Sequence, residues 1–136
     1  MLDHTGIVVS DLKAARTFYD AVAATLGLST KTMTPEFFLL GKSEDDPLPY
    51  LWIGTLTPSY WVQGSRPGIN QMHVAFKAES KAAVKAFHEA ALEAGGTDNG
   101  PPGPRPQSGY YGAFVLDPDG NNIEAVYRGE DALTAD

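Results

Sequence analysis

The sequence predicts an α+β fold made of two copies of one βαβββ unit, and two observations support this prediction. His4 precedes Phe18 by the same distance as His73 precedes Phe87, since 73 − 4 and 87 − 18 both give 69. Each histidine also opens an apolar stretch that leads into a helix cap and a helical pattern. Two such units can bring both imidazoles to one place when they pair.

Size and composition limit what the chain can be. Its 136 residues correspond to about one ordinary domain, here built from two half-size modules. A net charge of −7 repels phosphate backbones and anionic lipid surfaces, so neither nucleic acid nor a membrane is an expected partner. Cysteine is absent, so any metal would need nitrogen and oxygen ligands. No stretch resembles a signal peptide or a membrane span, which predicts a cytoplasmic protein.

The first predicted module covers residues 1–55. Residues 3–9 are expected to form a strand, because an apolar and β-branched run leads directly into a cap at Ser10 and Asp11. Apolar residues then recur at helical spacing until Gly27 ends the helix. Three further strands are predicted at residues 28–33, 36–40 and 49–54.

The second predicted module covers residues 70–128 and follows a connector, residues 56–69, that is interrupted by proline and glycine. It repeats the order of the first module. Its expected elements are a strand at residues 71–77, a helix capped by Ser80 and stopped by Gly95 and Gly96, and a hairpin of residues 110–116 and 122–128.

Two segments are predicted to lack regular structure. Residues 98–109 contain four prolines, which favours a surface loop and excludes a central strand. Residues 129–136 are expected to form a loose tail after the last strand.

Glu124 is the candidate carboxylate of a functional site. It alternates with apolar residues in the last predicted strand, and a buried carboxylate needs a cation, a hydrogen-bond network or an open cavity. A lone strand histidine is more often structural, but His4 and His73 hold the same place in both repeats. We therefore predict that His4, His73 and Glu124 bind one divalent metal ion, which could be Fe, Zn, Ni, Mn or Co.

Aromatic residues on the predicted strands suit a flat or partly apolar ligand. The residues expected to contact the substrate are Trp52, Phe38 and Phe114, together with Arg105, which suits a carboxylate or phosphate. Tyr110 or Tyr111 could serve as a proton donor, and the sequence does not decide which of them faces the site. We assign Tyr111, with Glu124, as catalytic.

The chain resembles the vicinal oxygen chelate superfamily, which includes glyoxalase I, extradiol dioxygenases, fosfomycin-resistance enzymes, methylmalonyl-CoA epimerase and bleomycin-binding proteins. The resemblance covers nearly the whole chain. It rests on His4 with Gly6–Asp11, Phe18 and Tyr19, Leu26–Leu28, His73–Phe76 and the closing Asp117–Glu124. It implies paired modules that form a half-open barrel around a metal, often in a homodimer. It also implies that His4, His73 and Glu124 occupy three metal-binding positions of the family.

The fourth metal position departs from the pattern of glyoxalase I. The repeat offset places the counterpart of Glu124 at Thr55, and residues 50–54 before it contain no carboxylate either. This counts against a standard glyoxalase I and leaves a three-ligand site.

We expect a metal-dependent enzyme, either a glyoxalase-like lyase or isomerase or a dioxygenase, that acts on a small substrate with vicinal oxygens. The alternative is a non-catalytic protein that binds a drug or metabolite, similar to bleomycin-resistance proteins. A third possibility is a subunit whose fold only supports assembly. The intact set of two histidines and a glutamate favours the enzyme.

Overall fold

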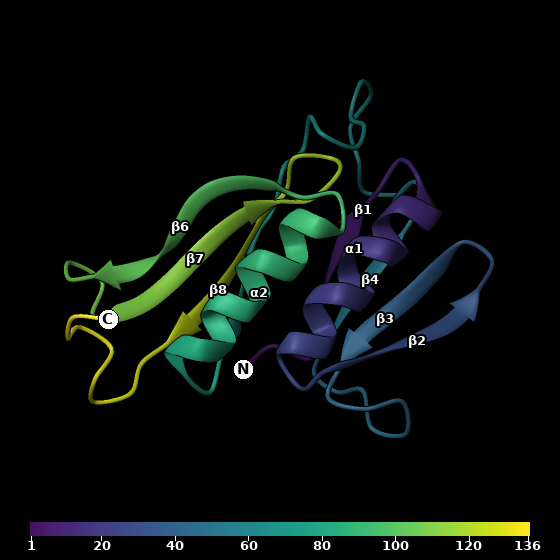
Figure 1. Cartoon of the computed structure of the whole chain (residues 1–136). Helices are drawn as coiled ribbons and strands as arrows, with labels where there is room; N and C mark the ends of the chain where they lie inside the picture. The colour runs from purple at the N-terminus through teal and green to yellow at the C-terminus, as the bar shows by residue number, and fades with distance from the viewer.

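The computed structural model describes residues 1–136 and contains two modules with the same order of elements (Figure 1). The first module consists of β1 (His4–Val8), α1 (Leu12–Thr25), β2 (Ser29–Thr34), β3 (Phe37–Gly41) and β4 (Tyr50–Gly54). The second consists of β5 (His73–Lys77), α2 (Lys81–Glu93), β6 (Thr97–Arg105), β7 (Tyr110–Leu116) and β8 (Asn122–Tyr127). The predicted α+β fold of two βαβββ modules is confirmed.

Each module forms one four-stranded mixed sheet, and the histidine-bearing strand lies at its edge. The strand orders are β1-β4-β3-β2 and β5-β8-β7-β6. The pairs β1–β4 and β5–β8 are parallel, and the other pairs are antiparallel. Strands β1 and β5 therefore each keep one side without a partner strand. The two helices lie side by side in Figure 1, and neither is long and apolar enough to cross a bilayer.

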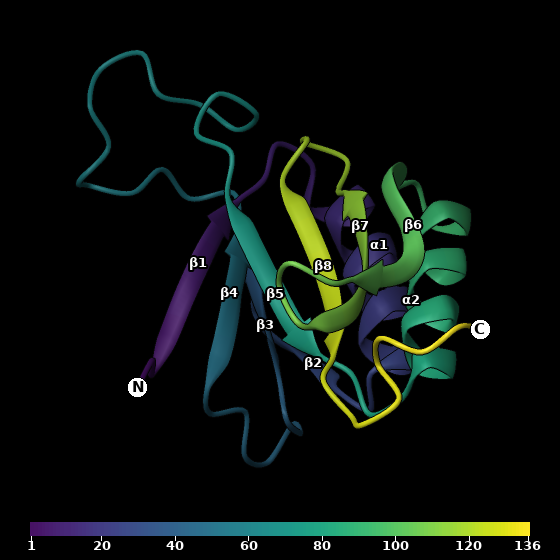
Figure 2. The ribbon, with the colours of Figure 1, turned by 90° about the vertical axis from the view of Figure 1, so that its left-hand side faces the viewer.

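One continuous apolar core joins the two modules on the helix side of the sheets. The repeat-related Phe18 and Phe87 are both fully buried in this core. Ile7 and Val9 are buried there as well, as the strand alternation predicts, whereas His4 points to the opposite face and is exposed. The helical side of each sheet is therefore packed, and the opposite face, which lies away from the helices in Figure 2, remains available for a site.

The turn between β7 and β8 connects the second module to the first through hydrogen bonds. The Tyr19 hydroxyl of α1 donates a hydrogen bond of 2.6 Å to the buried carboxylate of Asp117. That carboxylate also accepts the backbone N–H of Asn121 at 2.8 Å, and Asp119 accepts both the N–H and the hydroxyl of Ser10. Burial, followed by the charge of Asp117, raises the pKa of the Tyr19 phenol well above its ordinary value. The phenol therefore stays a donor at neutral pH.

The prediction of a loop for residues 98–109 was wrong for most of that stretch. Residues 97–105 form strand β6, whose prolines are tolerated because β6 pairs with β7 on one side only. Register shifts between Asp98 and Gly103 absorb the irregular backbone. His88 on α2 contacts strand β6, with its Nε2 atom 2.8 Å from Oδ1 of Asp98.

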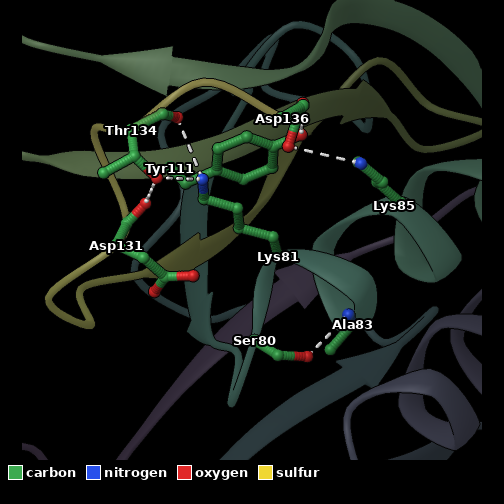
Figure 3. A network of polar contacts seen from close by, with 8 residues as sticks. All are labelled: Ser80, Lys81, Ala83, Lys85, Tyr111, Asp131, Thr134 and Asp136. Carbon is green, nitrogen blue, oxygen red and sulfur yellow. Dashed lines mark hydrogen bonds and ion pairs between the residues drawn. The ribbon is translucent and has the colours of Figure 1, made fainter.

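Residues 129–136 dock against the second module and do not form the loose tail expected from the sequence. Ala132 is 2% exposed, and Lys81 of α2 donates to the carbonyl and the hydroxyl of Thr134 at 2.9 and 3.0 Å. Figure 3 shows the tail lying across α2 and β7, with Asp136 at the hydroxyl of Tyr111. Ion pairing and hydrogen bonding from residues far apart in sequence hold this tail, so local composition did not predict it.

Candidate active site

His73 and Glu124 form a close pair on the face of the second sheet that points away from the helices. The parallel register aligns His73 with Asn122 and Ala75 with Glu124, so both side chains project from the same face. Nε2 of His73 lies 3.4 Å from Oε2 of Glu124. The imidazole is half exposed, whereas Glu124 is only 3% exposed. The second module thus presents one accessible nitrogen donor beside one buried carboxylate.

The Glu124 carboxylate fits a metal ligand better than a structural residue. Its Oε1 atom is buried and has no hydrogen-bond partner. Leaving a buried polar oxygen unpaired costs on the order of 1–3 kcal/mol, more for a charged group. An imidazole nitrogen next to a carboxylate oxygen is also a donor set that divalent first-row metals accept. The pair therefore fits part of a metal site, since a cation at this point would satisfy the unpaired oxygen.

Asn122 controls the orientation of the His73 ring. Its side-chain amide lies 2.8 Å from Nδ1, and its backbone carbonyl lies 3.3 Å from the same nitrogen. Asn99 on β6 donates in turn to the Asn122 side chain at 3.0 Å. The Nδ2 amide nitrogen of Asn122 can only donate, so Nδ1 accepts and the ring proton lies on Nε2, toward Glu124. A metal at Nε2 would require this proton to move to Nδ1, where the Asn122 backbone carbonyl can accept it once the side-chain amide turns away.

His4 does not join His73 and Glu124 within one chain. Its ring is exposed, stacks on Tyr50 at 4.9 Å, and contacts Asp3 through Nδ1 at 2.6 Å. No three His, Cys, Asp or Glu side chains of the chain lie close enough together to hold a metal ion. The predicted trio is thus divided into a pair in the second module and a single histidine in the first.

Trp52 occupies the position in the first module that Glu124 occupies in the second. Gly6 pairs with Trp52, just as the repeat-equivalent Ala75 pairs with Glu124. The assignment of Thr55 as the counterpart of Glu124 was therefore wrong, because the connections before the last strands differ in length between the modules. The first module still offers no carboxylate as a fourth metal ligand, because Trp52 has an indole and Thr55 an uncharged hydroxyl.

Two clefts border His4. The smaller, of about 280 Å³, is bordered on one side by β1 and β4 and on the other by the connector; its lining residues are His4, Gly6, Tyr50, Trp52, Leu56, Thr57, Pro58 and Tyr60. The larger, of about 470 Å³, has residues 74–77 of β5 on one wall and residues of β1, β3 and β4 on the other. The predicted substrate contact Trp52 thus lies in an aromatic cleft beside His4.

Tyr110, rather than Tyr111, faces the carboxylate. Phe114 pairs with Glu124 across β7 and β8, and residues at steps of two from Phe114, including Gly112 and Tyr110, share that face. Hydrogen bonding toward Glu124, followed by burial, raises the pKa of the Tyr110 phenol, while Arg105 and Arg128 oppose the rise. The contact is loose, because by strict geometry Oε1 of Glu124 still lacks a hydrogen-bond partner.

Two other predicted contacts, Phe114 and Arg105, lie on the same face as Glu124. The Phe114 ring is 6.4 Å from the His73 ring, and the Arg105 guanidinium carbon is 5.4 Å from the centre of the Phe114 ring. The structure therefore brings four predicted residues, His73, Glu124, Phe114 and Arg105, onto one surface of the second module.

Tyr111 and Phe38 lie on the helix side of the sheets, which contradicts their predicted roles. The Tyr111 ring is buried, and its hydroxyl donates to Asp136 at 2.7 Å (Figure 3). Burial and this hydrogen bond raise the pKa of Tyr111 to about 12. Phe38 is 1% exposed and lies under the guanidinium of Arg16. Strand alternation, which separates neighbours onto opposite faces, removes both residues from the site.

Replacing Tyr111 by phenylalanine is expected to release the tail without affecting the face that carries Glu124. Limited proteolysis should then cleave residues 129–136 severalfold faster than in the wild-type protein, because the Asp136 anchor loses its donor. Tyr110→Phe is the matched control and should leave the cleavage rate unchanged. Equal cleavage of the Tyr111→Phe variant and the wild-type protein would contradict the anchoring role.

Comparison with known proteins agrees with this architecture. The family model described as the Glyoxalase/Bleomycin resistance protein/Dioxygenase superfamily matches residues 1–125. A glyoxalase/bleomycin resistance protein from Albidiferax ferrireducens is 30% identical, with 95% of this chain and 99% of that chain covered and a TM-score of 0.72. A glyoxalase-related enzyme from Fulvimarina pelagi is 21% identical, with 97% and 94% covered and a TM-score of 0.73.

The lactoylglutathione lyase from Agrobacterium tumefaciens is similar at 22% identity, with 93% of this chain and 92% of that chain covered and a TM-score of 0.65. No curated protein matches the sequence. The chain belongs to the glyoxalase, bleomycin resistance and dioxygenase superfamily, also called the vicinal oxygen chelate superfamily. This superfamily is largely enzymatic and often metal-dependent.

Proposed function

We propose that the protein is a metal-dependent enzyme that acts on a small substrate with two neighbouring oxygens, as a lyase or isomerase or as a dioxygenase. The observation that carries this proposal is the buried Oε1 atom of Glu124, which lacks a partner and lies beside an accessible imidazole. A carboxylate kept in this state destabilises the fold unless it binds a ligand. His73 and Glu124 would hold the metal, and a bound divalent metal would polarise the substrate oxygens as a Lewis acid.

The other residues of the face would position the substrate and move a proton. Tyr110 keeps its phenolic proton at neutral pH, because the ordinary pKa of a phenol already lies well above neutral and hydrogen bonding toward Glu124 raises it further. It would therefore donate a hydrogen bond or a proton to a substrate oxygen near Glu124. The Phe114 ring offers an apolar surface between His73 and Arg105. Tyr110 thus takes the role that the sequence assigned to Tyr111.

The third ligand, His4, would come from a second copy of the chain. His4 is exposed and forms no metal-binding group with the His73–Glu124 pair, and the strands that carry the two histidines both have an open edge. In a twofold dimer, His4 of each chain would complete the site of the other chain. The predicted homodimer would therefore be a requirement for a complete site.

Metal analysis of mixed variants tests this proposal. Untagged wild-type protein should contain stoichiometric metal by elemental analysis, and His4→Ala and His73→Ala should each contain almost none. Both imidazoles are half exposed, so these variants should fold normally. When the two variants are refolded together, half of the dimers are mixed and each mixed dimer has one intact site. About a quarter of the wild-type metal content should then return.

The outcomes separate the parts of the proposal. Wild-type protein that takes up none of Fe, Zn, Ni, Mn or Co overturns the metal-dependent enzyme. Metal in the wild-type protein without recovery in the mixture overturns the shared site and assigns His4 to the site of its own chain. Circular dichroism of each variant checks that loss of metal is not loss of fold.

A second function, sequestration of an aromatic drug or metabolite without catalysis, is favoured by the cleft beside His4. Trp52, Tyr50 and Tyr60 line this cleft, and aromatic walls suit a flat ligand without any metal. This function predicts tight ligand binding that survives removal of metal and substitution of His73. The enzyme predicts loss of turnover in both cases.

A further inference from the structure

Three positively charged side chains near Glu124 have no acidic partner. Lys77, Arg105 and Arg128 take part in no ion pair, and the same is true of Lys13, Lys31, Arg66 and Lys81. What distinguishes Lys77, Arg105 and Arg128 is that they share one face of the second sheet. A group of positive charges on one face attracts a negatively charged ligand.

The strand register places these cations on the face that carries His73 and Glu124. Arg105 pairs with Tyr110 across β6 and β7, so the two side chains point the same way. The Arg128 guanidinium carbon is 4.8 Å from the centre of the Tyr110 ring, and that of Arg105 is 5.4 Å from the centre of the Phe114 ring. Two aromatic rings of β7 thus support two guanidinium groups.

Backbone carbonyls hold the arginines without neutralising them. Arg105 donates to the carbonyls of Pro101 at 2.7 Å and Pro104 at 3.4 Å, and Arg128 donates to the carbonyl of Ser108 at 3.0 Å. A guanidinium has more N–H groups than these bonds use, in a planar fork that suits a two-oxygen anion. The side chains are oriented, and their charge and several donors remain available.

Glycines make room for this arrangement. A Cβ atom at Gly103 would lie 3.3 Å from Nη1 of Arg105, and one at Gly112 would lie 2.7 Å from the Tyr110 ring and 3.1 Å from Oε1 of Glu124. Glycine at these positions lets Arg105 lie along β6 and lets Tyr110 lie against β7 beside the carboxylate. Arg128 also lines a cleft of about 330 Å³, whose other walls include Lys77, Ala75 and Val126.

We infer that the ligand of this face carries an oxyanion group, a carboxylate or a phosphate, that Arg105 and Arg128 bind, with Lys77 at the rim of the adjoining cleft. This inference rests on the proposed function in one respect: it takes the ligand of the arginines to be the substrate whose oxygens lie at His73 and Glu124. Phe114, between His73 and Arg105, would support the part of the molecule that joins the two ends. The substrate class is therefore a small anionic compound with two vicinal oxygens.

Anion titrations of the metal-free protein test the inference separately from the metal site. Inorganic phosphate and malonate are titrated into ¹⁵N-labelled protein, and the arginine Nε–Hε signals are followed by NMR. At least one anion should shift the Arg105 and Arg128 signals saturably, and the stronger binder identifies the group as phosphate or carboxylate. Arg105→Gln and Arg128→Gln should each weaken binding roughly tenfold, the loss expected for a charge-assisted hydrogen bond.

Controls separate this result from other effects. Lys13→Gln removes one charge from the exposed surface of α1 and should bind the anion like the wild-type protein. Arg105→Lys keeps the charge but not the fork, so it should bind with intermediate affinity even if Arg105→Gln folds poorly. His73→Ala should keep the anion site and lose only the metal. No saturable binding of either anion, or wild-type affinity in the double glutamine variant, would overturn the inference.

Discussion

Replacing Glu124 by glutamine is expected to weaken metal binding strongly while leaving the metal-free protein as stable as the wild type or more stable. Glu124 is 3% exposed, and its Oε1 atom has no hydrogen-bond partner, whereas Oε2 lies 3.4 Å from the His73 nitrogen, so the native state bears the cost of a buried charge that is only partly compensated. A neutral amide of the same shape removes that charge. We expect the free energy of unfolding at neutral pH, measured by urea denaturation with a chelator present, to rise by about 1 kcal/mol.

Metal affinity should change in the opposite direction. An amide oxygen is a poorer ligand than a carboxylate, so the affinity of Glu124→Gln for the metal found in the wild-type protein should fall on the order of 100-fold or more. Glu89→Gln, a substitution on the exposed surface of α2, is the matched control and should change neither quantity. A Glu124→Gln protein that is clearly less stable and still binds metal would mean that Glu124 is structural.

Replacing Asp117 by alanine is expected to cause the largest loss of stability of any single substitution considered for this chain. The buried carboxylate accepts the hydroxyl of Tyr19 at 2.6 Å and two donors of Asn121, its backbone N–H and its side-chain amide. Removing the carboxylate leaves these buried donors without partners. We expect the free energy of unfolding to fall by about 3 kcal/mol or more in urea denaturation.

The same variant tests whether the turn joins the modules. Tyr19 belongs to α1 and Asp117 to the second module, so hydrogen exchange should accelerate in both modules and not only around the turn. Asp131→Ala removes an exposed carboxylate that accepts one tyrosine hydroxyl, and it should have little effect. Unchanged stability of Asp117→Ala would show that the hydrogen bond between Tyr19 and Asp117 does not join the modules.

Much of the fold could be predicted because its signals are local. The helix caps at Asp11 and Ser80 and the apolar spacing around Phe18 and Phe87 depend on residues near in sequence, and the structure confirms them. The sequence did not predict strand β6, because proline lacks the backbone N–H that a central strand must donate. β6 is an edge strand with hydrogen bonds on one side only, so its prolines are tolerated. The docking of the tail depends on contacts with Lys81 and Tyr111, which no local pattern reveals.

The site could be predicted only in part, because the face of a strand depends on register. The turn at Asp117–Gly120 sets the register that identifies Tyr110. It pairs Leu116 with Asn122 and therefore Phe114 with Glu124. Tyr110 lies four residues before Phe114, so its side chain points to the same face as Phe114 and Glu124. That count would have excluded Tyr111 from the sequence alone. The separation of His4 from its expected partners could not be predicted, because it depends on how whole modules pack.

Trp52 has a consequence for the symmetry of the molecule. The two modules share one order of elements and one strand order, and a site built from two identical halves would accept a ligand in two equivalent orientations. In this chain one half offers an imidazole with a carboxylate, and the equivalent place in the other half holds an imidazole beside an indole. The two ends of a ligand bound across both halves would therefore meet chemically different surroundings. This loss of internal symmetry would let the protein select one orientation of such a ligand.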